Sequence, residues 1–512
     1  MATLVSKNFN VNLAQQFKES FTESDPTQYY LFYARVNPWP VETSPPSFSD
    51  NIKFTDYDIW RGMLSLKKVS NNNVTMAVSK YTWTTNTVYT KYTDDNASLS
   101  TSQFYVITSN NNVYKCLDNS NSAPSTVSPT GQTTSIISTS DGYRWKFMYS
   151  ISQADINRFA GGEFIPVKTL ATDDGSPQWD VQQAAANGAI NIVQVTNGGS
   201  GYLENKGTVA AVTSTTQLTI ANTGFGSDSA YNGSTIFISS GLGAGQVRII
   251  TAYNAATKLI TVNTAFGVSP NTSSTYHIGP RINMIGDGVD STAYANVQSG
   301  AITKITTVNP GSNYSLVNVG ISANPSYGSG ATAVAYLPPF GGHGSDPVRE
   351  LFATNVTLNV EVVGSEQGFF AANNQFRVYG LMKDPIIKAT GGVASSLRYD
   401  QTLRLTANAV SGIYSQDEFV IGSTSGARGR VVYFANSNVS GTKGVIHLTN
   451  VSGSFSNTET LTGNTSSVTA QLRGITQPDL LQYTGSMLYA VTQEPIERDA
   501  DQTENFTITA RF

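Results

Sequence analysis

The stretch TIFISSGLGAGQVRIITAYNAATKLITVNT, residues 235–264, indicates the fold class of this chain. It holds three runs, 235–239, 246–253 and 258–264, in which β-branched or aromatic residues alternate with smaller or polar ones. Alternation with a period of two places every second side chain on the same face of a strand. We therefore predict three strands here, separated by a tight turn at 241–245 and a second turn at 254–257.

Similar runs, such as 30–36, recur through most of the sequence and are divided by Asn, Gly and Ser. Helical signals are few. One lies at 12–21, and a polar residue precedes a proline at Asp346-Pro347 and at Gln477-Pro478, where a short helix can begin. These patterns predict a mainly β fold in which a few short helices pack on sheets.

Internal similarity is visible at two places. The segments GAI at 188–190 and NGGSGY at 197–202 return, with the same spacing, as GAI at 300–302 and NPGSNY at 309–314. We interpret each copy as a strand followed by a Gly-rich turn, ending in an aromatic residue that covers the edge of the next strand.

The second similarity aligns residues 414–431 with 455–472, so that Glu418 matches Glu459 and Gly422 matches Gly463. It predicts a small duplicated β module. The resulting organisation is a scaffold interrupted by two β-rich insertions. The predicted segments are 1–185 (N-terminal scaffold), 186–335 (insertion), 336–410 (middle scaffold), 411–474 (insertion) and 475–512 (C-terminal scaffold).

Composition limits the classes of function. A chain of 512 residues is long enough for two to four domains, and its single cysteine, Cys116, is expected to be a buried, inert thiol. Charged residues make up 13% of the chain, against about 25% in a typical soluble domain. The net charge is −4 and no run of Lys or Arg occurs, so we expect no nucleic-acid partner. Residues 1–6 lack the apolar stretch of a signal peptide, so we expect a soluble cytoplasmic product with no membrane partner.

Metal and cofactor sites are not predicted. His277, His343 and His447 lie in different segments, each without a second His or Cys at metal-ligand spacing. The glycines of 241–245 resemble a dinucleotide-binding loop, but such a loop opens a helix, whereas 246–253 alternates like a strand. A tight β-turn is the preferred interpretation.

Catalytic chemistry has weak candidates. Paired carboxylates hydrolyse glycosides, and the candidate acids are Asp94, Asp95, Asp173, Asp174, Glu497, Asp499 and Asp501. Adjacent acids on loops are usually solvated turn residues, and no Gly-x-Ser-x-Gly elbow stands between a strand and a helix. We expect no enzyme. The 25 Tyr and 23 Phe residues are expected mainly in cores, with a sugar-binding face on an insertion as the alternative.

An ordered set of short motifs carries a resemblance to a known family. The motifs lie at 5–21, at 30–39, at 58–60, in the runs VYKCLD and DGYRWKF at 113–118 and 141–147, at 376–385 and at 485–512. Their marker residues are Pro38, Trp39, Trp60, Tyr114, Cys116, Leu117, Asp118, Gly142, Tyr143, Trp145, Gly485, Met487, Tyr489, Pro495, Asp501, Gln502, Thr503 and Phe512. Together they resemble the baseplate wedge protein encoded by the eighth gene of T-even-type contractile-tailed phages. The resemblance covers nearly all of the segments outside the two insertions, which depart from the family's pattern.

The resemblance implies a β-sandwich scaffold with short helices on long loops. It also implies a homodimer within each of six wedges around the tail hub, contacts with other wedge proteins, assembly in the host cytoplasm, and no catalysis or cofactor. Two rival functions remain: a host-glycan-binding tail adhesin or fibre-associated protein, and a polysaccharide depolymerase. The contacts of the insertions, with protein or with glycan, are left open.

Overall fold

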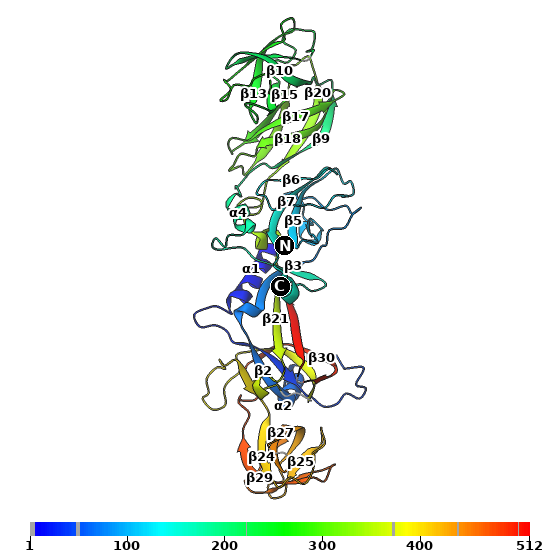
Figure 1. Cartoon of the computed structure of the whole chain (residues 1–512), viewed down its shortest axis with the longest axis vertical. Coiled ribbons are helices and arrows are strands. Elements are labelled where there is room, and N and C mark those ends of the chain that lie inside the picture. Colours follow the sequence, from blue (N-terminus) through cyan, green and yellow to red (C-terminus); the bar gives the residue numbers. More distant parts are fainter. Residues whose placement is uncertain (1–5, 48–51, 222, 371–373, 438–439, 500) are drawn as a thin grey trace, which may run out of the picture. The chain divides into compact units, whose positions relative to one another are not determined.

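The computed structural model describes residues 6–47, 52–221, 223–370, 374–437, 440–499 and 501–512 (Figure 1). The chain forms two compact units: unit 1 is Met1–Ala77 with Thr354–Phe512, and unit 2 is Val78–Ala353. Strands dominate both units and helices are short and few, which confirms the predicted mainly β fold. No helix in the described part of the chain is long and apolar enough to cross a membrane.

Unit 1 contains a β-sandwich. One antiparallel sheet has the order β23-β2-β1-β22-β30, and the facing strands are β31, β21 and β3. Tyr33 of β1 stacks on Phe376 of β22 with ring centroids 4.4 Å apart and meets Phe506 of β31 at 5.1 Å, so aromatic rings fill the space between the layers. The bounds are β1 Tyr29–Ala34, β2 Met63–Val69, β3 Val74–Ser79, β21 Asn355–Val363, β22 Asn374–Lys383, β23 Arg398–Asp400, β30 Ser486–Arg498 and β31 Thr503–Arg511.

Two helices pack on this sandwich. Helix α1 (Lys7–Glu19) begins at Ser6, whose side chain accepts the amide N–H of Phe9, so the helix predicted at 12–21 is confirmed with an earlier start. Helix α2 (Ile52–Gly62) is one that the sequence analysis missed, and its Trp60 is buried against the first sheet. Helix α1 contacts β21, and α2 contacts β1.

The helix predicted at Gln477-Pro478 is wrong, because this segment is irregular coil. The side chain of Gln401 donates to the carbonyl of Leu480 at 3.2 Å and accepts its amide N–H at 3.1 Å. A side chain thus satisfies backbone groups that a helix would otherwise pair internally.

The second duplication folds as one closed barrel in unit 1, with the order β24-β27-β26-β25-β28-β29. The carboxylate of Glu459 accepts the amide N–H groups of Thr424 and Ser425 at 3.0 and 2.9 Å, in the turn of the first copy. Glu418 accepts the equivalent groups of Thr465 and Ser466, in the turn of the second copy, at 3.0 and 2.9 Å. Each copy therefore caps the turn of the other. The bounds are β24 Leu403–Asn408, β25 Phe419–Gly422, β26 Arg428–Asn436, β27 Lys443–Ser452, β28 Thr460–Gly463 and β29 Thr469–Thr476.

Unit 2 contains a four-stranded sheet of order β4-β5-β7-β6 with helices around it. Asp346 caps the short helix α5, as predicted from Asp346-Pro347, whereas α3 and α4 were not predicted. The bounds are β4 Tyr105–Ile107, β5 Asn112–Asn119, β6 Ile137–Ser138, β7 Tyr143–Ser150, β8 Phe164–Val167, α3 Gln153–Phe159, α4 Pro177–Gln183 and α5 Pro347–Glu350; 3₁₀ turns lie at Asn71–Asn73 and Glu366–Gly368 in unit 1 and at Leu99–Thr101 in unit 2.

The first duplication builds a second layer of unit 2, a sheet of order β18-β17-β16-β19 beside the pair β20-β9. Tyr202 and Tyr314, which end the two copies, are buried in one shared core. The amide N–H of Tyr202 donates to the carbonyl of Gly300, which opens the other copy, and the ring of Tyr202 covers Gly328 just before β20. The ring of Tyr202 therefore covers the start of a strand that is distant in sequence, and the predicted cover of the next strand along the chain stays a prediction. The bounds are β9 Ile192–Ser200, β16 Arg281–Gly286, β17 Thr292–Gln298, β18 Ala301–Asn309, β19 Val317–Ser322 and β20 Ser329–Tyr336.

The closed barrel of unit 2 contains the stretch 235–264 and has the order β10-β11-β14-β13-β12-β15. The three predicted strands are β12, β13 and β14, joined by turns at the predicted places, and 241–245 is the tight turn of a hairpin. The predicted boundaries of the two insertions stay predictions. The strands of the first duplicated region and the unit 2 barrel run from Ile192 to Tyr336, and those of the unit 1 barrel run from Leu403 to Thr476. The bounds are β10 Asn205–Ser214, β11 Gln217–Ile220, β12 Thr235–Ser240, β13 Val247–Asn254, β14 Leu259–Val262 and β15 Thr275–Gly279.

Candidate functional site

The family-resembling residues of unit 2 are interior residues. Tyr114 and Cys116 on β5 and Tyr143 and Trp145 on β7 are all fully buried in one core, where the rings of Tyr143 and Trp145 stack at 5.5 Å. Burial raises the pKa of the Cys116 thiol well above its usual value, which suits an inert thiol.

Three neighbours of that core have local structural roles. Leu117 is buried, and Asp118 lies 3.7 Å from Arg144 on the next strand. Gly142, in the turn before β7, has a φ of +89°, a backbone conformation that residues other than glycine rarely adopt.

In unit 1 the family-resembling residues divide between interior and surface. Trp60 is buried, and Trp39 is half-buried and donates its indole N–H to the carbonyl of Gln493 at 3.1 Å. On the edge strand β30, Tyr489 is 40% exposed. The remaining positions are half-buried or exposed; they are Pro38, the turn glycine Gly485, Met487, Pro495, Asp501, Gln502, Thr503 and Phe512.

The histidines and acids considered as chemical candidates do not converge on one site. His343 and His447 are buried, in unit 2 and unit 1, and burial lowers the pKa of each, to about 3 for His447. Asp173 and Asp174 each accept an amide N–H from the turn that follows them. His277 lies half-buried on β15, and Asp94 accepts the amide N–H of Leu337. The other candidate acids are Asp95, Glu497, Asp499 and Asp501. No group of three side chains that could hold a metal ion occurs among the described residues.

Buried arginines join the barrel of unit 1 to the sandwich. Arg35, at the end of β1, is 1% exposed and makes a two-pronged contact with Asp417 of the barrel, with N–O distances of 3.0 and 2.7 Å. In the reverse direction, Arg430 on β26 donates to the carbonyl of Val36 and to the side chain of Asn37. Two-pronged arginine–carboxylate contacts fix orientation as well as distance, so these contacts set how the barrel is joined to the sandwich within unit 1.

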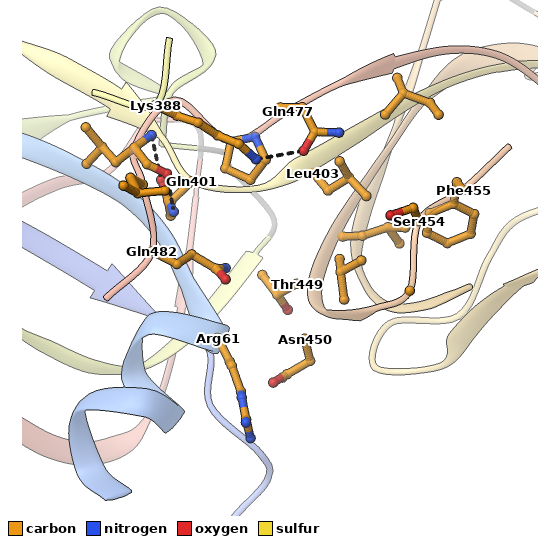
Figure 2. Close-up of a pocket in the computed structure, with 17 residues that line it drawn as sticks. Arg61, Lys388, Gln401, Leu403, Thr449, Asn450, Ser454, Phe455, Gln477 and Gln482 are labelled. Carbon is orange, nitrogen blue, oxygen red and sulfur yellow. Dashed lines mark hydrogen bonds between the residues drawn. The ribbon is translucent and has the colours of Figure 1, made fainter. Parts of the chain in front are cut away.

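A pocket of about 270 Å³ opens in unit 1 between the end of α2, the end of β27 and the segment after β29 (Figure 2). Its cationic lining residues are Arg61 and Lys388, and the described residues that line it include no Asp or Glu. Lys388 donates from Nζ to Oε1 of Gln477 at 2.9 Å. The local charge is therefore positive, although the chain as a whole is weakly negative.

The pocket also holds polar atoms without partners. Thr449 is 3% exposed, and its hydroxyl has no hydrogen-bond partner in the described structure. The side-chain NH₂ group of Asn450 is likewise buried without one. Figure 2 shows Thr449, Asn450 and Gln482 extending toward the same opening as Arg61. A buried polar group that lacks a partner costs about 1–3 kcal/mol, so these groups are suited to meeting a polar ligand.

Sequence reasoning did not nominate this pocket. Arg61 follows the family-resembling Trp60, but Lys388 and Thr449 belong to segments far along the chain, and no short motif contains them. Only the folding of β27 beside α2 brings them together.

No family model matches the chain, and no curated protein matches it. A solved structure described as "Virion of native gene transfer agent (GTA) particle" is similar at 11% identity, over 52% of this chain and 83% of that chain, with a TM-score of 0.14. A TM-score this low does not establish a shared fold.

Proposed function

We propose that this chain is a non-enzymatic structural subunit of a phage virion, a baseplate wedge protein of a contractile tail. In this role it bridges neighbouring wedge proteins and takes part in baseplate assembly and its rearrangement on infection. The observation that carries the proposal is that several of the resembling positions lie in the interior. Trp60, Tyr114, Tyr143 and Trp145 are core residues of the two units, so the resemblance concerns the fold-forming positions.

Stiffness supports the same role. A wedge subunit has to hold its neighbours at fixed angles, and close-packed interiors resist deformation. Unit 1 adds buried ionic contacts to its apolar core: Arg498 is 2% exposed and donates to Glu504 and to the carbonyls of Phe370 and Gly364. Removing one partner of such a contact typically costs about 3–5 kcal/mol, so the arrangement is held in a single geometry.

The proposed partners are other wedge proteins and a second copy of this chain. Strand β30 lies at the edge of its sheet and presents Leu488 and Tyr489, which are 47% and 40% exposed. Exposed aromatic and aliphatic side chains on an edge strand are typical of protein interfaces.

Cross-linking mass spectrometry on purified, intact virions tests this proposal. We expect links from this chain to itself and to other wedge proteins, with β30 among the linked segments. Light scattering on the isolated chain should give twice the mass of 54.7 kDa at micromolar concentration. Links confined to fibre tips, together with a monomeric mass, would contradict the proposal.

The second candidate function is a glycan-binding tail adhesin or fibre-associated protein. The cationic pocket with unpaired polar groups beside Arg61 favours it. In that case the cross-links of the virion experiment would lie at the fibres, and host cells that lack their surface polysaccharide would no longer retain the purified chain.

A further inference from the structure

We propose that the pocket beside Arg61 binds a sugar that carries a carboxylate, such as a hexuronate unit of a surface polysaccharide. This inference goes beyond the structural role and does not depend on it, because it concerns a site within unit 1 alone.

The sign of the charge is the first argument. Arg61 and Lys388 line the pocket without a lining carboxylate among the described residues. The ammonium of Lys388 donates to a neutral amide, that of Gln477. Asp58 on the same helix interacts electrostatically with Arg61 but does not line the pocket. On the pocket side the guanidinium favours an anion, and its planar donors match the two oxygens of a carboxylate.

The unpaired polar groups are the second, independent argument. The hydroxyl of Thr449 is almost completely shielded from solvent, and the NH₂ group of Asn450 is buried, yet neither has a hydrogen-bond partner in the described structure. Both residues line the pocket and extend toward the opening beside Arg61 in Figure 2. A ligand with its own donors and acceptors would satisfy them.

The mixture of donors and acceptors favours a sugar over an acidic peptide. Arg61 and Asn450 offer N–H donors, whereas the amide of Gln482 and the hydroxyls of Thr449 and Ser454 also accept hydrogen bonds. A side-chain carboxylate accepts only, while the hydroxyls of a sugar ring both donate and accept. The volume of about 270 Å³ lies just below the roughly 300–1,000 Å³ of typical ligand pockets, which suits one sugar ring.

Saturation-transfer NMR and calorimetry on the full chain test the inference, with D-glucuronate and D-galacturonate as probes. D-glucose and D-galactose are the neutral controls, and a hexa-glutamate peptide represents an acidic protein segment. We expect one or both hexuronates to bind with at least tenfold higher affinity than the corresponding neutral hexose, because the charged contact is lost with the carboxylate.

Two substitutions separate binding from folding. Arg61→Ala removes an exposed cation and should weaken hexuronate binding at least tenfold, whereas Arg473→Ala, at an exposed arginine that does not line the pocket, should leave it unchanged. Thr449→Val keeps the shape of the side chain and removes an unpaired hydroxyl. It should weaken binding several-fold without lowering the melting temperature, an outcome that a purely structural role of Thr449 does not predict.

Equal binding of hexuronates and neutral hexoses, or no binding of any sugar, would overturn the inference. So would tighter binding of the glutamate peptide through Arg61, which would identify the pocket as a protein-docking site. Each of these results leaves the virion cross-linking experiment unaffected, so failure here is distinguishable from failure of the structural role.

Discussion

In both duplicated regions of this chain, each copy contacts the other copy, but the groups that make these contacts differ. In the barrel of unit 1, each copy supplies a buried glutamate that accepts N–H groups from the turn of the other copy. In the layer around Tyr202 and Tyr314, each copy ends in a tyrosine whose backbone meets the first residues of the other copy and whose ring covers a glycine. The two copies of each repeat are thus joined at their turns, through carboxylate hydrogen bonds in the barrel and through aromatic packing in the other region.

Glycines in the two regions leave room for the glutamate and tyrosine side chains that make these contacts. A Cβ atom on Gly422 would lie 2.5 Å from the carboxylate of Glu459, and one on Gly463 would lie 2.6 Å from that of Glu418. A Cβ on Gly328 would lie 2.2 Å from the ring of Tyr202. In the barrel each glycine leaves the space that the carboxylate of the other copy occupies, and Gly328, which lies outside both copies, leaves the space that the ring of Tyr202 occupies.

The largest expected effect comes from removing both carboxylates of the unit 1 barrel. The double substitution Glu418→Ala and Glu459→Ala leaves several buried N–H and O–H groups unpaired, and each costs about 1–3 kcal/mol. We expect a loss of more than about 5 kcal/mol and full hydrogen exchange across β24–β29, measured by peptide-resolved mass spectrometry. Glu361→Ala, at an exposed glutamate of β21, is the control. Retained protection of the barrel would show that its apolar core suffices.

Removing one aromatic cap should have a smaller, local effect. Tyr202→Ala and Tyr314→Ala each empty a buried site and should cost about 3–5 kcal/mol, by analogy with Phe→Ala in cores. Exchange should then accelerate in β9, β18 and β20, while the unit 1 barrel stays protected. If the two substitutions differ widely in their cost in unfolding free energy, the contacts that each copy makes with the other are not equivalent.

Acidification should distinguish the two regions without any mutation. Burial alone would raise the pKa of the Glu418 and Glu459 carboxyls, but the donors around each outweigh it and hold the pKa below the usual 4.5. Because the folded-state pKa is depressed, the stabilisation is complete above pH 4.5 and is lost as the pH falls through the lower folded-state value. Hydrogen exchange at pH 6 and pH 3.5, corrected for intrinsic rates, should show loosening of the barrel before the tyrosine-capped layer. Simultaneous loosening would argue against the carboxylates as its cause.

The smallest effect separates the two tyrosines from each other. The hydroxyl of Tyr202 accepts the amide N–H of Ala331 at 3.2 Å, so Tyr202→Phe should cost about 1 kcal/mol. Tyr314→Phe should cost less, because no such contact joins its hydroxyl to the described residues. Thermal unfolding of both variants measures the difference, and equal values would mean that the Ala331 contact contributes nothing net.

Several features of the fold were predictable because they depend on local pattern. Alternation in 235–264 predicted three strands and both turns, and the second repeat identified Glu418 and Glu459 as equivalent positions. Helix α2 was missed, since its burial against the first sheet depends on Trp60 meeting a distant partner strand. The helix predicted at Gln477-Pro478 failed because the side chain of Gln401, distant in sequence, satisfies the backbone there.

The candidate site shows the same limit more strongly. Arg61, Lys388 and Thr449 carry no motif, and their proximity follows from the way the barrel is joined to the sandwich through Arg35 and Arg430. The strand content, the turns and the two duplications are predictable from the amino-acid sequence, because they follow from periodicity and from residues that tolerate a positive φ. Tertiary structure alone decided which turn each glutamate or tyrosine caps and where a positive pocket opens, because those outcomes depend on contacts between residues far apart in the chain.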